Sequence, residues 1–154
     1  MAKSKKVVIV DDESKARKML QLKLEEHFPD LEITKSASGA DEAMQFLAEN
    51  QTDIVFLDIS MPKKSGLDML KEMPEKDFAV IFITSYDSYA IEAIKFSAQG
   101  YILKPIDDKE LVETVNRTLK NRKKNNNRKM NQATLKNLSL ENTSQKLFGI
   151  PSQE

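Results

Sequence analysis

The sequence contains no cysteine and no tryptophan, and only 6% of its 154 residues are aromatic. Without cysteine the chain forms neither a disulfide nor a thiolate metal site, as expected for a cytoplasmic protein. Long apolar runs are also missing: the longest, such as residues 79–83, fall far below the roughly 20 residues of a membrane helix. The basic start precedes only four apolar residues, 7–10, and predicts no secretion signal. We therefore expect a cytoplasmic protein without membrane contact.

The whole chain has no net charge, because its 24 basic residues balance its 24 acidic ones. The balance differs along the chain: residues 1–120 hold 17 Lys and Arg against 22 Asp and Glu, and residues 121–154 hold 7 against 2. This asymmetry indicates an acidic body and a basic tail. We expect a folded domain over 1–122, a basic Asn- and Lys-rich linker over 123–144, and a third segment over 145–154.

The basic run that follows residue 120 has two interpretations. Basic residues bind nucleic acid, but this run lacks the interleaved aromatic residues that would support such a role. No apolar residue appears in it before Met130, so it has little to contribute to a core. We favour a linker or a solvated extension of the last helix.

Short β-branched runs alternate with stretches of helical periodicity from residue 5 to about residue 120. This order is typical of βα units that form a parallel sheet with helices on both faces. The third helix is expected near residues 65–73, the fourth over 88–96, and the fifth after Asp107 and Asp108, which suit a helix N-terminus. The predicted strands cover residues 6–10, 32–36, 54–57, 80–83 and 101–103. The sequence therefore predicts a doubly wound α/β fold with five parallel strands.

Apolar residues recur at helical spacing between the predicted strands, and we expect them to face the core. Methionine and leucine at this spacing usually fill a core and rarely line a cofactor site. The single histidine, His27, lies near the end of the first helix and is expected on the surface. The residues expected to face the core are Met19, Leu20, Leu22 and Leu24 in the first helix, Ala40, Ala43, Met44 and Leu47 in the second, and Leu111, Val112, Val115 and Leu119 in the fifth.

Polar residues follow four of the predicted strands at the point where each strand ends. They are Asp11 and Asp12, then Asp58, then Thr84 with Ser85, and finally Lys104 with Pro105. In an open parallel sheet, ligands bind just beyond the carboxyl ends of the strands. Each residue alone has an ordinary explanation such as helix capping, but capping does not explain their joint placement. We expect all of them to converge on one crevice.

Three carboxylates in one crevice would repel one another unless a cation compensates their charge. Magnesium prefers oxygen ligands, keeps several waters and is usually held by one or two carboxylates. Asp12 and Asp58 are the expected direct ligands, and Asp11 is expected to act through water or by orienting the others. A backbone carbonyl near Ser60 could complete the protein ligands. The sequence therefore predicts a Mg²⁺ site at this edge.

Asp58 is the expected nucleophile of the site. A carboxylate at a strand end can attack phosphorus and become an aspartyl phosphate. Phosphoryl transfer depends on positioning and charge stabilisation, and Thr84 and Lys104 supply a hydroxyl and an ammonium for the phosphoryl oxygens. The pattern predicts a domain that accepts a phosphoryl group on Asp58.

Residues 5–122 closely resemble the receiver domain of bacterial two-component response regulators. The resemblance rests on Val-Asp-Asp-Glu at 10–13, Leu-Asp-Ile-Ser-Met-Pro at 57–62 followed by Gly66, Thr84, and Tyr-Ile-Leu-Lys-Pro at 101–105. It implies a flavodoxin-like fold with strand order 2-1-3-4-5 and a histidine kinase as phosphoryl donor. It also implies the following roles: Asp58 as phosphoacceptor, Asp11 and Asp12 as the metal-site pair, Thr84 and Lys104 as phosphoryl sensors, Tyr101 as the switch aromatic, Ser60 at a position that influences dephosphorylation, and a cis Lys104–Pro105 bond.

Two segments look more specifically like receivers joined to a LytTR-type DNA-binding domain, namely residues 84–91 and 98–105. The final segment, 145–154, resembles the first strand of such a domain. The resemblance implies that DNA is bound only through a C-terminal domain that lies beyond this sequence. It also implies that phosphorylation moves Tyr101 and reshapes the surface of the fourth helix, fifth strand and fifth helix, through which we expect homodimerisation.

Two other functions fit parts of the pattern. A phosphatase of the haloacid dehalogenase type also uses a strand-end aspartyl phosphate with magnesium, but it requires a second acid two residues further on, where this chain has Ser60. A binding module that works without phosphorylation would typically lack the acidic pair or the lysine, and neither is lost here. Both alternatives are therefore ranked below the phosphoacceptor domain, which is expected to be a signalling domain and no turnover enzyme.

Overall fold

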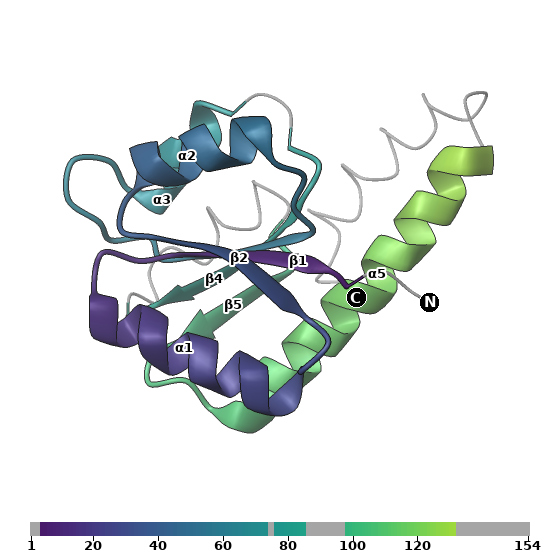
Figure 1. Ribbon diagram of the computed structural model, residues 1–154, viewed down its shortest axis with the longest axis horizontal. Coiled ribbons are helices and arrows are strands. Elements are labelled where there is room, and N and C mark those ends of the chain that lie inside the picture. The colour runs from purple at the N-terminus through teal and green to yellow at the C-terminus, as the bar shows by residue number, and fades with distance from the viewer. Residues whose placement is uncertain (1–3, 74–75, 86–97, 132–154) are drawn as a thin grey trace, which may run out of the picture.

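The protein is described by a computed structural model that defines residues 4–73, 76–85 and 98–131. Five parallel strands form one sheet in the order β2-β1-β3-β4-β5, which confirms the predicted doubly wound fold (Figure 1). The elements are β1 (Lys6–Val10), α1 (Ser14–His27), β2 (Glu32–Ala37), α2 (Ala40–Glu49), β3 (Ile54–Leu57), α3 (Gly66–Lys71), β4 (Ala79–Thr84), β5 (Gly100–Leu103) and α5 (Asp108–Asn131).

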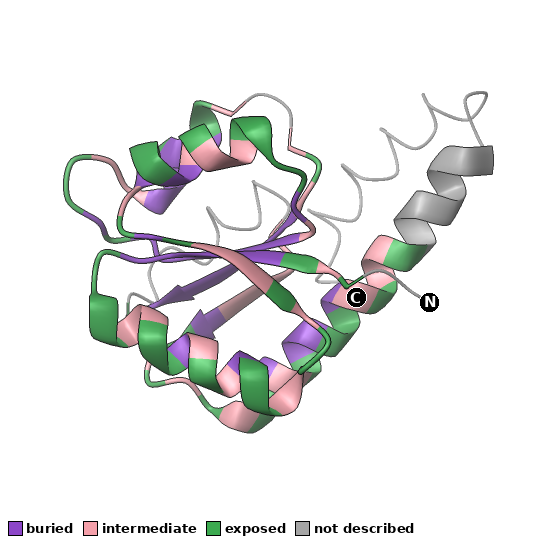
Figure 2. Cartoon of the chain, in the orientation of Figure 1, coloured by how far each residue is buried: buried purple, intermediate pink, exposed green. Residues whose placement is uncertain are grey.

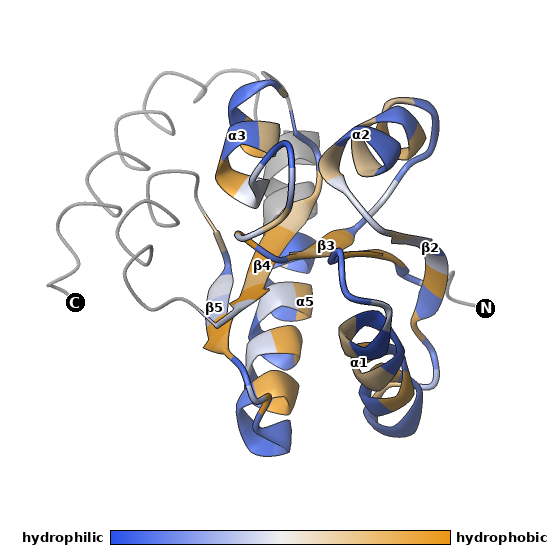
Figure 3. Ribbon diagram, turned by 90° about the vertical axis from the view of Figure 1, so that its left-hand side faces the viewer, coloured by the Kyte–Doolittle hydropathy of each residue, from blue (hydrophilic) through white to orange (hydrophobic). Residues whose placement is uncertain are grey.

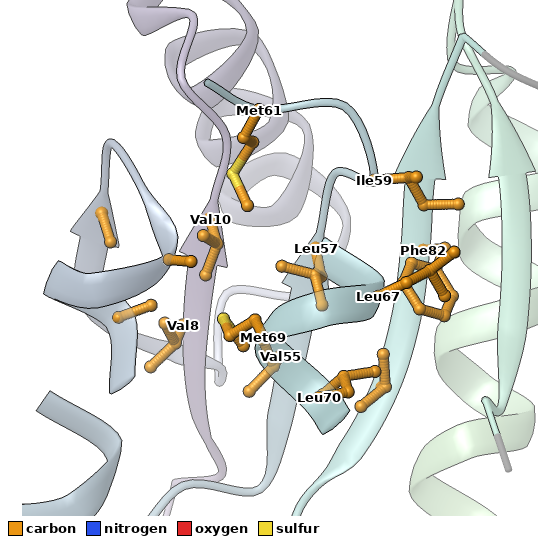
Figure 4. Close-up of a cluster of buried hydrophobic side chains, with 14 residues drawn as sticks. Val8, Val10, Val55, Leu57, Ile59, Met61, Leu67, Met69, Leu70 and Phe82 are labelled. Carbon is orange, nitrogen blue, oxygen red and sulfur yellow. The ribbon is translucent and has the colours of Figure 1, made fainter. Parts of the chain in front are cut away.

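Two apolar layers enclose the sheet, one on each face. Successive side chains of a strand point to opposite faces, so Val8 and Val10 of β1 join the layer under α2 and α3, whereas Val7 and Ile9 join the layer over α1 and α5. Figure 2 shows that the inner strands are buried, whereas the edge strand β2 and the outer sides of the helices are partly exposed. Figure 3 shows the apolar β3 and β4 in the middle, and Figure 4 shows the first layer in detail. Both faces of β1, β3 and β4 are buried, which explains why these three strands are nearly continuous apolar runs.

The predicted core-facing stripe of α1 is only half right. Leu20 and Leu24, which lie one turn apart, are buried, but Met19 and Leu22 are 55% and 53% exposed. Residues two apart on a helix differ by roughly 200° around its axis, so Leu22 lies opposite the stripe formed by Leu20 and Leu24. The prediction for Met19 and Leu22 is therefore wrong, and α1 buries a narrower stripe than its leucine content suggests.

The stripes predicted for the other two helices fit the structure better. Ala40 and Ala43 of α2 are buried, and Met44 and Leu47 pack against the same layer. In α5, Leu111 and Val115 are buried at a spacing of four residues. Leu119 packs against them, and Val112 is only partly buried.

Helix α5 continues through the basic run to Asn131, which agrees with the helix extension that the sequence analysis left open beside a linker. The loss of apolar residues after position 120 marks the end of core contact, but Lys and Arg are good helix formers and let the helix continue. The first part of the predicted linker is thus helical. The fourth predicted helix, 88–96, lies outside the described residues. None of the helices in the described part of the chain is long and apolar enough to cross a membrane.

Candidate functional site

The register of the strands brings the polar strand ends together. Val10 pairs with Leu57, and the Asp58 amide donates to the Val10 carbonyl at 3.0 Å, so Asp11 and Asp58 follow neighbouring strands at one level. On the other side of β4, the Lys104 amide donates to the carbonyl of Thr84 at 2.9 Å. The four strand ends therefore meet at the carboxyl edge of the sheet.

Three carboxylates gather at this edge. Asp11, Asp12 and Asp58 each offer an oxygen within 4.8 Å of the others. Asp11 and Asp58 are only 5% and 6% exposed, whereas Asp12 is exposed to solvent. The cluster is therefore buried on the sheet side and open to solvent beside Asp12.

Lys104 lies between the two buried carboxylates. Its Nζ is 2.8 Å from Asp11 Oδ2 and 3.3 Å from Asp58 Oδ2, with Glu13 Oε1 at 3.8 Å. Burial alone would lower the pKa of Lys104, but the hydrogen bond to Asp11 and the charges of both aspartates outweigh it and raise this pKa. The ammonium therefore stays protonated and partly compensates the acidic cluster.

The environment of Asp58 makes its ionised form costly. Burial raises the pKa of Asp58 and the nearby Asp11 charge adds to this rise, although the Lys104 charge, a Thr84 side-chain hydrogen bond and the Ser60 backbone N–H act in the opposite direction. The net shift is upward, so one ammonium does not fully stabilise the charged carboxylate. A further cation at this position would do so.

The loop between β1 and α1 is fixed by contacts that the sequence did not reveal. The guanidinium of Arg17 donates to the Asp11 carbonyl at 2.6 Å, and the Glu13 amide donates to Asp11 Oδ1 at 2.9 Å. The macrodipole of a helix favours acidic residues near its N-terminus, where α1 has none. An arginine near that end was therefore a sign in the sequence that its side chain has a specific partner. Arg17 is therefore a candidate positioning residue for the acidic pair.

The loop between β3 and α3 holds Asp58 from the other side. The Ser60 amide donates to Asp58 Oδ1 at 3.2 Å. Gly66 packs so closely that an added Cβ would lie 2.3 Å from the Asp58 carbonyl oxygen, which explains the glycine. Lys64, which the sequence analysis did not single out, bridges Asp41 of α2 and Glu72 just after α3, at 2.9 Å from each. The Ser60 carbonyl as a metal ligand stays a prediction.

Tyr101 lies outside the acidic cluster. It is half-buried on β5 and packs against Phe82 of β4, with ring centroids 6.0 Å apart and planes inclined by 47°. The Lys104–Pro105 bond is cis, as predicted. His27 lies at the surface, where its Nε2 is 3.0 Å from Asp108 Oδ2, and Lys23 binds the other oxygen of this carboxylate. The histidine thus links α1 to α5 away from the phosphoacceptor candidate.

The chemistry of the donor set fits magnesium. The three clustered side chains offer only carboxylate oxygens, which are hard ligands, and Asp12 leaves the cluster open to the waters that Mg²⁺ retains. Burial raises the pKa of Asp58 despite the Lys104 charge, so a further cation beside Asp58 would stabilise its ionised form. The fold and this cluster together define a flavodoxin-like domain with an acidic site at its sheet edge.

Comparison with known proteins places this domain in a family. Residues 7–116 match the model of the response regulator receiver domain, so the chain belongs to that family. The transcriptional regulatory protein BtsR of Escherichia coli K12 is 42% identical over 120 residues, which are 77% of this chain and 50% of that protein. The sensory transduction protein LytT of Bacillus anthracis is 38% identical over 120 residues, or 76% and 48% of the two chains. The chain spans about half the length of these curated relatives.

Solved structures show the same fold. The response regulatory domain of mrkE from Klebsiella pneumoniae superimposes with a TM-score of 0.72 at 28% identity, covering 77% of this chain and 98% of that one. The response regulator TrrA from Thermotoga maritima, solved in complex with Mg(2+)-BeF, gives a TM-score of 0.66 at 33% identity, with coverages of 74% and 98%. The protein is therefore a receiver domain of the two-component type, a signalling domain whose relatives regulate transcription.

Proposed function

We propose that the domain accepts a phosphoryl group on Asp58 from a phosphohistidine of a sensor histidine kinase, with Mg²⁺ as cofactor. The observation that carries the proposal is the placement of Asp58. It is buried at the end of the central strand, within 4.8 Å of the oxygens of Asp11 and Asp12, and 3.3 Å from the ammonium of Lys104. A purely structural role would not require four charged groups at the same edge of the sheet.

These positions support the following reaction. An oxygen of Asp58 forms the new bond to phosphorus while the bond from phosphorus to the donor nitrogen breaks, and the electron pair leaves with the imidazole. Lys104 donates to a phosphoryl oxygen, and the Thr84 hydroxyl donates to another. Asp11, Asp12 and Asp58, with the Ser60 carbonyl, would hold Mg²⁺, which neutralises phosphoryl charge when bound.

Phosphorylation would be read by the residues around the site. The added group carries about −1.5 to −2 charges and three acceptor oxygens, which attract Thr84 and Lys104. Tyr101 lies on β5 three residues before Lys104, so a shift of this strand end reaches its ring. We infer that Tyr101 changes position and that β5 and α5, with the helix predicted from the sequence at 88–96, then form the surface of a homodimer.

The relatives support an output in transcription. BtsR is described as a transcriptional regulatory protein and LytT as a sensory transduction protein, and each is about twice as long as the matched region. The Mg(2+)-BeF complex of TrrA supports a metal-dependent phosphoryl site in this family. We infer a cytoplasmic regulator that binds DNA through a separate C-terminal domain of the LytTR type and not through the receiver domain.

Intact-mass spectrometry with acetyl phosphate and Mg²⁺ tests the proposal. The wild type should gain one phosphoryl group, and Asp58→Asn or removal of the metal by EDTA should abolish the gain. Asp30→Asn, which changes an exposed acid outside the site, should leave labelling intact. Equal labelling of Asp58→Asn and Asp30→Asn would contradict the assignment.

Analytical ultracentrifugation with beryllofluoride and Mg²⁺ tests the dimer. The mass of the wild type should double, and Asp58→Asn should stay monomeric under the same conditions. A wild type that stays monomeric with the mimic bound would refute dimerisation but not phosphorylation.

A further inference from the structure

A cleft opens beside the acidic cluster, between helix α1 and the segment that joins β5 to α5. It has a volume of about 270 Å³ and is lined by residues of α1, of strands β1, β3 and β4, and of the Lys104–Ile106 segment. Small-molecule sites typically start at about 300 Å³, so this cleft suits a small ligand. Of the residues that line it, only Asp11, Asp58 and Lys104 take part in the proposed phosphoryl chemistry.

Most of the cleft wall is apolar. Ile9, Phe56 and Ile83 form the buried floor, and α1 contributes Leu20 and Met19. Met19 is 55% exposed although it lies in this wall, so apolar surface is left in contact with water. A ligand that covered this wall would gain free energy in proportion to the apolar area it removes from water.

Helix α1 exposes two large apolar side chains, Met19 and Leu22. Leu22 is almost equally exposed, at 53%, but does not line the cleft. The two residues therefore form a matched pair, with similar side chains on one helix, of which only Met19 faces the cavity.

The lysines that line the cleft differ in whether they have an acidic partner. Lys104 is paired with Asp11 and Asp58, and Lys23 is paired with Asp108. Lys15 also lines the cleft, and it forms no salt bridge with any acid in the described part of the chain. The cleft thus offers an apolar wall with one uncompensated ammonium.

We propose that this cleft binds a small amphipathic anion, with an apolar chain or ring and a single carboxylate or sulfonate. The apolar part lies against Phe56, Ile83 and Met19, and the anionic group lies beside Lys15. Charge complementarity favours an anion over a cation at this position, because three lysines and only two acids line the cleft and Lys15 has no acidic partner among the described residues. The site does not require phosphorylation of Asp58, so its failure and that of the proposed function are separable.

Titration of the ¹⁵N-labelled full chain with decanoate, below its micelle concentration, tests this site by NMR. Saturable shifts are expected at the amides of Ala16, Leu20 and Ile106, which line the cleft. Displacement of the fluorescent probe 1-anilinonaphthalene-8-sulfonate by decanoate gives the affinity independently. A charge placed in the apolar wall should weaken binding by about tenfold in Met19→Glu, and Leu22→Glu should bind like the wild type.

A second pair of variants tests the position of the anionic group. Lys15→Gln should weaken decanoate binding severalfold, whereas Lys18→Gln removes an exposed charge of α1 outside the cleft and should have no effect. All four side chains are exposed, and circular dichroism should show wild-type folding. Absence of saturable binding to the wild type, or equal effects within either pair, would overturn the proposal.

Discussion

Replacement of Lys104 by methionine isolates the electrostatics of the site. The ammonium lies 2.8 Å from Asp11 Oδ2 and 3.3 Å from Asp58 Oδ2, and the side chains of these three residues are only 18%, 8% and 7% exposed. Methionine has similar length and no charge, so it removes the compensation while it largely fills the space. Two buried carboxylates are then left without their cation.

The cost of this change follows from the burial. Removal of one partner from a buried ion pair typically destabilises a protein by 3–5 kcal/mol. Because the cluster is open to solvent beside Asp12, we take the lower end and expect a loss of about 3 kcal/mol at pH 7. For a domain of this size the loss corresponds to a Tm lower by roughly 10 °C.

The pH dependence of the stability of Lys104→Met tests the direction of this effect. Burial already raises the pKa of Asp58, and loss of the Lys104 charge raises it further. A carboxyl whose folded pKa lies above its unfolded value stabilises the fold at pH below the unfolded pKa, and this contribution is lost as pH rises through the folded pKa. Lys104→Met should therefore recover stability relative to the wild type as pH falls from 7 toward 4.

Urea unfolding at several pH values, with and without Mg²⁺, measures this prediction. Mg²⁺ should stabilise Lys104→Met more than the wild type, because it replaces the missing charge. Lys15→Met, an exposed lysine without an acidic partner in the described residues, is the control and should lose less than about 0.5 kcal/mol. If Lys104→Met were as stable as Lys15→Met at pH 7, the account of the site would be refuted.

Two further variants test the supports of the site, and a third tests the link between α1 and α5. Gly66→Ala forces a Cβ against the carbonyl of the candidate acceptor and should cost about 1–3 kcal/mol in urea unfolding and slow acetyl phosphate labelling; Gly39→Ala, with nothing within 4 Å, should be nearly neutral. Arg17→Ala should weaken Mg²⁺ binding severalfold in calorimetry, and Lys18→Ala should not. Asp108→Asn should lower stability at pH 7; its partners lower the pKa of Asp108, so the difference should vanish as pH falls through this lowered pKa.

The sheet and the gathering of the site were predictable because they depend on strand boundaries. Each strand is an apolar run that stops at a polar residue, and parallel strands place these stops at one edge. The positions of the strand ends in the sequence were therefore enough to predict that Asp11, Asp58 and Lys104 lie close together. Their roles in phosphoryl transfer stay predictions.

Features that depend on three-dimensional neighbours could not be predicted. Helical spacing separates Leu22 from the stripe of Leu20 and Leu24, but only the placed neighbours of α1 show which side faces the core, so the exposure of Met19 and Leu22 was missed. Arg17 binds the Asp11 carbonyl, and Lys64 binds Asp41 and Glu72; these contacts join segments whose loop geometry is not encoded in any periodicity. Such loop contacts appear only once the backbone is placed.

Identification of the labelled residue tests the central claim most directly. The protein is treated with acetyl phosphate and Mg²⁺, the acyl phosphate is reduced with borohydride, and the resulting homoserine is located by tandem mass spectrometry. We predict a single Mg²⁺-dependent homoserine at position 58. Homoserine at another aspartate, or at position 58 without Mg²⁺, would contradict the account.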